Sequence, residues 1–126
     1  MISFEQFVME DGVPIYLQII TYLKRGIAAG VIHDGDEVPS RRMLSALLGV
    51  NPNTVQKSYA MLEEEGLLIS RTGAKSCIRV TEGAVQRLKQ ELLSAGVKAM
   101  VASMKQMGMS LADAQKTIEA LWEAEA

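Results

Sequence analysis

Apolar residues between positions 14 and 66 recur at helical spacing in three segments, and this pattern predicts three helices. The first begins after Pro14, since proline suits a first helical turn, and it ends near Gly30. Ser40 caps a second helix, SRRMLSALL, which ends at Gly49. The third begins with the Asn-Pro pair at 51–52 and runs to about residue 65. Its expected buried stripe consists of Val55, Ser58, Tyr59 and Leu62.

The segment LLISRTGAKSCIRV, residues 67–80, predicts two short strands joined by a turn around residues 72–74. Side chains along a strand alternate between its two faces, so only some of the side chains in these two strands can point into a core. The residues that we expect to point inward are Ile69, Val80 and either Cys77 or Ile78. The chain is therefore expected to be mainly α with a small β hairpin.

Residues 81–126 predict two amphipathic helices. Thr81 caps the first, over about 82–107, and Ser110 caps the second after a break at Gly108. Two such helices cannot enclose a ligand cavity by themselves, and we expect their apolar faces to pack against a second copy. The expected dimer contacts are Leu92, Gly96, Met100, Met104, Leu111, Ile118 and Trp122. The chain thus divides into a domain of residues 1–80 and a dimerisation tail of residues 81–126.

The net charge of −2 is unusual for a nucleic-acid binder, but the charge is unevenly distributed. Residues 1–37 carry two bases against six acids, residues 38–80 carry six against three, and residues 81–126 carry five against six. Positive charge is concentrated around the second and third helices, and phosphate attraction depends on local charge. The three acids of the middle segment lie together at 63–65, at the far end of the third helix.

Three features of the middle segment predict a DNA-binding winged helix-turn-helix. Gly49 and Val50 alone join the second helix to the third, which permits a close crossing. The start of the third helix carries short polar side chains, which suit base edges and phosphates. A basic hairpin, the wing, follows directly, and its tip would contact phosphates or a minor groove. Its basic residues are Arg71, Lys75 and Arg79. The glutamates at 63–65 would then point away from the duplex.

Four segments resemble the GntR family of bacterial repressors: PIYLQI (14–19), GDEVPSRRMLS (35–45), LGVNPNTVQKSYAMLEEEGLL (48–68) and SRTGAKSCIRV (70–80). The short tail, with MGMSLADAQ, resembles the YtrA-like subfamily. The resemblance implies a homodimeric winged-helix regulator of transcription, a repressor that binds a palindromic operator. It also implies control of a neighbouring transporter operon and of the regulator's own gene.

The resemblance implies which residues contact DNA. Ser40 and Arg42 would contact phosphates and a base, with Arg41 at a variable position beside them. The family's wing glycine corresponds to Gly73, next to Arg71 and Lys75 in the wing. The contacts from the third helix would be Asn51, Asn53, Thr54, Gln56 and Lys57, with Tyr59 near the DNA backbone.

Two positions depart from the family pattern. Many relatives have an arginine where this chain has Pro52, and a second wing glycine where it has Lys75. Without an arginine at the first of these positions, guanine readout would rest on Arg41 or Arg42. Lys75 adds positive charge to the wing but fits a minor groove less tightly than glycine does.

Other function classes find little support. No catalytic set, phosphate-binding loop or dinucleotide fingerprint occurs, so we expect no enzyme, cofactor or metal. The single cysteine excludes an intramolecular disulfide and is typical of a reducing compartment, so we expect a cytoplasmic protein. No apolar run of about 18 residues occurs, and no membrane partner is expected.

Two alternatives to DNA binding stay open. One is a protein–protein adaptor built on a winged helix, favoured by the acidic total charge, and the other is a binder of structured RNA. A small-molecule effector, if the protein has one, would bind at the dimer interface or between the tail and the winged helix. The sequence identifies neither an operator nor an effector.

Overall fold

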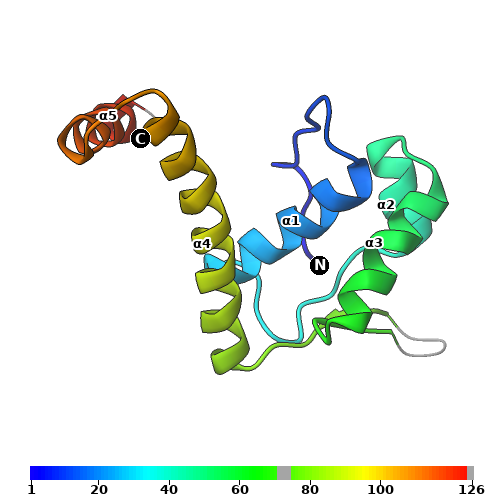
Figure 1. The fold of residues 1–126 in the computed structure, drawn as a ribbon. Helices are drawn as coiled ribbons and strands as arrows, with labels where there is room; N and C mark the ends of the chain where they lie inside the picture. The colour runs from blue at the N-terminus through cyan, green and yellow to red at the C-terminus, as the bar shows by residue number, and fades with distance from the viewer. Residues whose placement is uncertain (71–74, 125–126) are drawn as a thin grey trace. The chain divides into compact units, whose positions relative to one another are not determined.

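The computed structural model describes residues 1–70 and 75–124 (Figure 1). Its elements are α1 (Ile15–Ala28), α2 (Arg41–Leu48), α3 (Pro52–Glu64), β1 (Leu68–Ile69), β2 (Cys77–Ile78), α4 (Glu82–Gln106) and α5 (Leu111–Ala124). This is the expected helical architecture with a small hairpin between the third and fourth helices. The chain forms two compact units, Met1–Lys89 and the residues from Gln90 onward.

Side-chain caps begin α2 and α3, as the sequence predicted. The Ser40 hydroxyl accepts a hydrogen bond of 3.1 Å from the backbone N–H of Met43. The Asn51 side-chain oxygen accepts one of 2.8 Å from the backbone N–H of Asn53. Gly49 ends α2 with a φ of 68°, a left-handed conformation that glycine adopts without steric cost. The start and direction of both helices are therefore determined locally.

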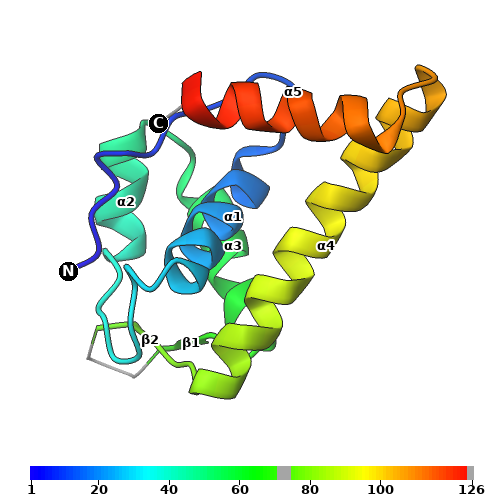
Figure 2. The same cartoon turned by 90° about the vertical axis from the view of Figure 1, so that its left-hand side faces the viewer.

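The core of the first unit lies between α1 and α3, which pack side by side (Figures 1 and 2). The whole predicted stripe of α3, Ser58 included, is buried. The Ser58 hydroxyl lies 3.0 Å from the carbonyl oxygen of Tyr16 and 3.1 Å from that of Thr54, so this buried polar group is satisfied. The α1 residues buried in the core are Ile19, Ile20, Leu23 and Ile27.

The hairpin is shorter than expected and its inward face differs by one residue. Leu68 pairs with Ile78 and Ile69 with Cys77, in antiparallel register. Leu68 and Ile78 are buried, while Ile69 and Cys77 are half-buried. The expectation that Ile69 points inward was therefore wrong, because paired residues share a face and Ile78 is the inward residue of β2.

The loop before α2 lies along β2 and extends the small sheet. The backbone N–H of Val38 donates to the Ser76 carbonyl at 3.0 Å, and the N–H of Ile78 donates to the Asp36 carbonyl at 2.8 Å. Glu37 forms an antiparallel bridge with Cys77. These bonds attach the hairpin to the segment that leads into α2.

The first turns of α4 belong to the first unit. Thr81 caps the helix by accepting a hydrogen bond of 3.1 Å from the N–H of Ala84, and Leu88 is buried. The compact unit extends to Lys89, whereas the sequence suggested a boundary after residue 80. Whether residues 1–80 fold independently stays a prediction.

The second unit contains the rest of α4 and α5. Ser110 caps α5 by accepting a hydrogen bond of 3.1 Å from the N–H of Asp113. Between residues 90 and 124 no side chain is buried. Its exposed large apolar residues are Leu93, Val97, Met100, Val101, Met107, Leu111, Ile118, Leu121 and Trp122. Among residues 1–70 and 75–124, no helix combines the length and the hydropathy needed to span a bilayer.

Candidate nucleic-acid interface

α2 and α3 are joined by a two-residue turn, the geometry of a helix-turn-helix. Gly49 and Val50 form the turn, and the backbone N–H of each donates to the Ser45 carbonyl. Leu44 of α2 is fully buried, and α2 packs directly against α3. The polar start of α3 therefore directly follows the end of α2.

The start of α3 presents exposed polar side chains. Asn51, Asn53, Gln56 and Lys57 are exposed, and Thr54 is half-buried. The Asn51 side-chain oxygen is occupied by the helix cap, so its amide N–H groups are the part available to an outside partner. A base edge or phosphate approaching this end would meet mainly hydrogen-bond donors.

Lys57 is held against the body of the domain. Its Nζ lies 3.8 Å from the centre of the Tyr16 ring, a cation–π contact that fixes the ammonium beside the N-terminal half of α1. The charge stays accessible, because Lys57 is exposed. The sequence did not suggest this pairing, which joins residues 41 positions apart.

The two arginines at the start of α2 have different surroundings. Arg42 is exposed, whereas Arg41 is half-buried. The Arg41 Nη2 donates to the Glu63 carboxylate at 2.8 Å, and its Nε donates to the Gln56 side-chain oxygen. Its guanidinium lies 5.2 Å from the centre of the Tyr59 ring. Of the two arginines considered for guanine readout, Arg42 is the one that faces outward.

Glu63 connects this arginine to the hairpin. The Ser70 hydroxyl donates to the Glu63 carboxylate at 2.6 Å, and it lies 2.9 Å from the Ser76 hydroxyl. Ser70 follows β1 and Ser76 precedes β2, so one polar network joins α2, α3 and both sides of the hairpin. The sequence placed Glu63 only in an acidic group pointing away from DNA. Its bond to Arg41 gives it a structural role as well.

The wing is partly described. Arg71 and Gly73 lie outside the described residues. Lys75 is exposed, with its Nζ 3.2 Å from the Glu37 carboxylate, and Arg79 is also exposed. An ion pair this exposed contributes little to stability, so Lys75 can exchange Glu37 for a phosphate at small cost.

The structure corrects the expected role of Tyr59. Its side chain is fully buried, and its hydroxyl donates a 2.7 Å hydrogen bond to the Pro39 carbonyl. Burial raises the pKa of Tyr59 well above its usual value of 10, and the nearby Arg41 offsets this only in part. A side chain without exposed surface does not contact DNA, so Tyr59 holds the loop before α2 in place instead.

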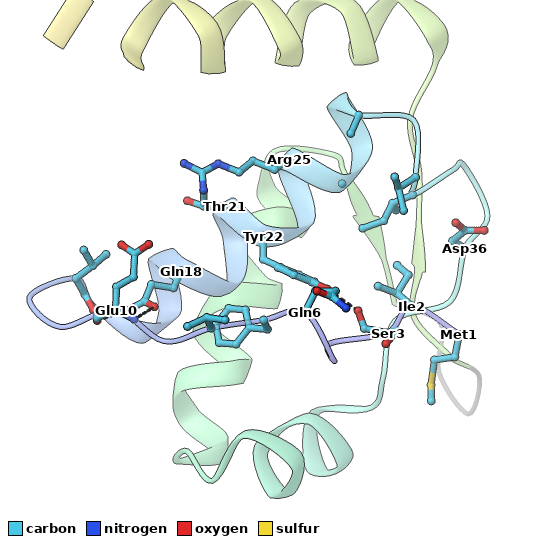
Figure 3. Close-up of a pocket in the computed structure, with 17 residues that line it drawn as sticks. Met1, Ile2, Ser3, Gln6, Glu10, Gln18, Thr21, Tyr22, Arg25 and Asp36 are labelled. Carbon is cyan, nitrogen blue, oxygen red and sulfur yellow. Dashed lines mark hydrogen bonds between the residues drawn. The ribbon is translucent and has the colours of Figure 1, made fainter. Parts of the chain in front are cut away.

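A cavity of about 990 Å³ lies between the N-terminal segment and α1 (Figure 3). Tyr22 crosses it and donates to the Ser3 carbonyl at 2.8 Å. Gln18 fastens the segment to α1, because its amide bonds both the N–H and the carbonyl of Glu10, at 2.8 and 3.0 Å. All of the lining residues lie between positions 1 and 36, so the cavity is separate from the polar start of α3.

A helix-turn-helix followed by a hairpin, with arginine and amide side chains along one edge, defines a DNA-binding winged helix protein. Residues 15–77 match the bacterial regulatory proteins of the gntR family. The chain is 35% identical over 88 residues to the HTH-type transcriptional repressor YtrA of Bacillus subtilis, covering 65% of this chain and 68% of YtrA. The chain belongs to the GntR family, and it is a transcriptional regulator rather than an enzyme.

Solved structures agree with this assignment. A GntR family transcriptional regulator from Listeria monocytogenes superposes with a TM-score of 0.77 at 27% identity, over 91% of this chain and 98% of that one. The AraR DNA-binding domain in complex with operator ORX1 superposes with a TM-score of 0.50 at 27% identity, over 56% and 86% of the two chains. The fold of the first unit is therefore one that occurs bound to operator DNA.

Proposed function

We propose that the protein is a sequence-specific repressor that binds a palindromic operator as a homodimer. The observation that carries the proposal is the pairing of an exposed arginine, Arg42, with an exposed, donor-rich start of α3 on one helix-turn-helix. Such an edge suits a major groove, where guanine presents two acceptors and each phosphate carries negative charge. The net charge of residues 38–80 is positive, which supports the same assignment.

The DNA contacts divide into two groups by chemistry. Arg42 has the forked donors that match guanine, while Ser40 and Lys57 suit phosphates. Lys75 and Arg71 in the wing would follow the phosphate backbone, with Gly73 allowing a close approach. The α3 side chains proposed to read or border base edges are Asn51, Asn53, Thr54 and Gln56.

Dimerisation through the tail is supported by its apolar exposure. Trp122 is 76% exposed and Leu111 75%, which is unusual for residues of this size in a single folded chain. A second copy would cover them, and two helix-turn-helix units could then occupy half-sites about one helical turn apart. The proposed contact residues are Leu92, Gly96, Met100, Met104, Leu111, Ile118 and Trp122.

The proposed regulatory role is repression in the cytoplasm by occupying a promoter and excluding polymerase. YtrA is named a transcriptional repressor, which supports repression rather than activation. We infer the targets from the resemblance to YtrA-like regulators: the regulator's own gene and a neighbouring transporter operon.

Fluorescence anisotropy against the duplex upstream of the protein's own gene tests this function. The titration is run at several salt concentrations, with random DNA and structured RNA as competitors. We expect tight, salt-sensitive binding that survives excess random DNA. Absence of duplex binding even at low salt would contradict the proposal and favour a protein–protein adaptor, and preferential displacement by RNA would favour an RNA binder.

A further inference from the structure

We propose that Arg41 is a positioning residue that determines which atoms Gln56 presents to a base. The inference rests on the DNA binding proposed above. Arg41 sits between Gln56, Glu63 and the Tyr59 ring, and these contacts come from successive turns of one face of α3. The arginine next to it, Arg42, is exposed and makes no such set of contacts among the described residues. Two adjacent arginines therefore have separate tasks.

The chemistry of the contact orients the Gln56 amide. A guanidinium has only donors, so the amide atom facing Arg41 must be the oxygen. The Gln56 NH2 group then points away from Arg41. The orientation follows from donor–acceptor complementarity, whereas an amide without such a neighbour could rotate by half a turn.

The fixed amide has a consequence for base readout. Two donors match acceptors in the major groove, namely guanine O6 and N7, adenine N7 and thymine O4. An unrestrained glutamine would also accept from adenine N6 in a bidentate pair. With its oxygen engaged by Arg41, Gln56 is expected to favour acceptor-rich edges, guanine above all, and to lose the usual glutamine preference for adenine.

Glu63 holds Arg41 in this position and neutralises it. The carboxylate accepts from Arg41 at 2.8 Å and from Ser70 at 2.6 Å, so it is anchored from the hairpin side. A guanidinium paired in this way has little charge to offer a phosphate. Arg41 should therefore affect base preference while leaving the salt dependence of binding unchanged.

In vitro selection with the wild-type chain, followed by binding to duplexes changed one base pair at a time, tests the inference. Gln56→Ala identifies the base pair that Gln56 reads, by the loss of roughly 5- to 100-fold discrimination there. Arg41→Met should change the preference at the same base pair, and the double variant should behave like Gln56→Ala alone. The slope of log affinity against log salt should stay unchanged in Arg41→Met. In the matched variant Lys75→Met, which removes a proposed phosphate contact, the magnitude of this slope should fall by about 0.9.

A change at a different base pair, additivity with Gln56→Ala, or a reduced salt slope in Arg41→Met would overturn the inference, because each would mean direct contact between Arg41 and DNA. A measurement on the free protein tests the contact between Arg41 and Gln56 without DNA. Its failure can therefore be distinguished from a failure of the proposed DNA binding. In the NMR spectrum of the free protein, the Arg41 Nε–H should exchange slowly with water, and Gln56→Ala should make it exchange fast. Wild-type exchange as fast as that of Arg42 would also overturn it, even if no duplex bound.

Discussion

The hydroxyl of Tyr59 donates a 2.7 Å hydrogen bond to the carbonyl of Pro39, entirely out of contact with solvent. This bond joins the middle of α3 to the residue directly before the cap of α2. It fixes where α2 begins relative to the middle of α3, and hence the placement of Arg42, the second residue of α2.

Tyr59→Phe should lower the free energy of unfolding by about 1–3 kcal/mol, because it leaves the buried Pro39 carbonyl without this donor. Urea denaturation measures the loss. Tyr16→Phe is the matched control, since the hydrogen bond at that residue uses its backbone carbonyl. Equal losses in the two variants would show that the Tyr59–Pro39 bond contributes nothing specific.

The stability difference between wild type and Tyr59→Phe should depend on pH in the alkaline range. Burial raises the pKa of Tyr59 in the folded protein, so the folded state keeps a proton that the unfolded chain releases near pH 10. The contribution of the neutral hydroxyl is complete below about pH 10 and falls as the pH rises above it, by up to about 1.4 kcal/mol per pH unit. Urea denaturation of both proteins between pH 8 and 11 should show the difference narrowing, and a constant difference would contradict the assignment.

Gly26→Ala should destabilise the first unit although alanine favours helices. A Cβ at this position would clash with Cδ1 of the buried Ile32 and lie 2.8 Å from its Cγ1. Overpacking of this kind costs about 1–3 kcal/mol. Thermal unfolding measures the stability of Gly26→Ala. The control is Gly83→Ala, where the nearest atom to an added Cβ is 3.5 Å away. Ile32→Val in the Gly26→Ala background should recover part of the loss, and no recovery would place the strain elsewhere.

Arg42→Ala should weaken operator binding by about 1–3 kcal/mol and relax specificity at one position, if it makes a bidentate base contact. Lys75→Ala should instead weaken binding to all duplexes by similar factors and flatten the salt slope. Anisotropy titrations on operator and random DNA separate the two effects. The same pattern in both variants would mean that specificity and positioning have been assigned to the wrong residues.

Removal of the tail should convert the protein to a monomer. Truncation after Lys89 keeps the buried Leu88 and the whole first compact unit, which truncation after Val80 would not. Sedimentation equilibrium should show a dimer for the full chain and a monomer for the truncated one, with weaker binding to full operators. Trp122→Glu in the full chain should also favour the monomer, whereas Gln90→Glu should not. A truncated protein that stays dimeric and binds full sites equally well would contradict tail-mediated dimerisation.

The helices and their caps were predictable because each cap is a local event. Ser40, Asn51, Thr81 and Ser110 each accept from a backbone N–H two or three residues further on, so the signal lies within one turn. Which residues of the hairpin strands point inward was less predictable. Strands of two residues carry almost no alternation, and pairing with the loop before α2 helps decide which face is inward.

The polar network around Arg41 could not be read from the sequence. Its members are 15, 22 and 29 positions from Arg41, and nothing in their spacing distinguishes them from solvated surface residues. The resemblance assigned Tyr59 to the DNA backbone, while the helical periodicity placed it in the buried stripe. The structure agrees with the periodicity, because a large aromatic residue gains more from burial than from exposure.

The cap and proline that begin α3 have a consequence for the kinetics and thermodynamics of association. The ring of Pro52 fixes its φ, and the Asn51 side chain closes the first turn, so the end of α3 that is proposed to face DNA is already ordered in the free protein. Little conformational entropy is then lost there on binding. The association rate should be set by electrostatic steering and by the spacing of the two half-sites, rather than by local folding of the helix that enters the groove.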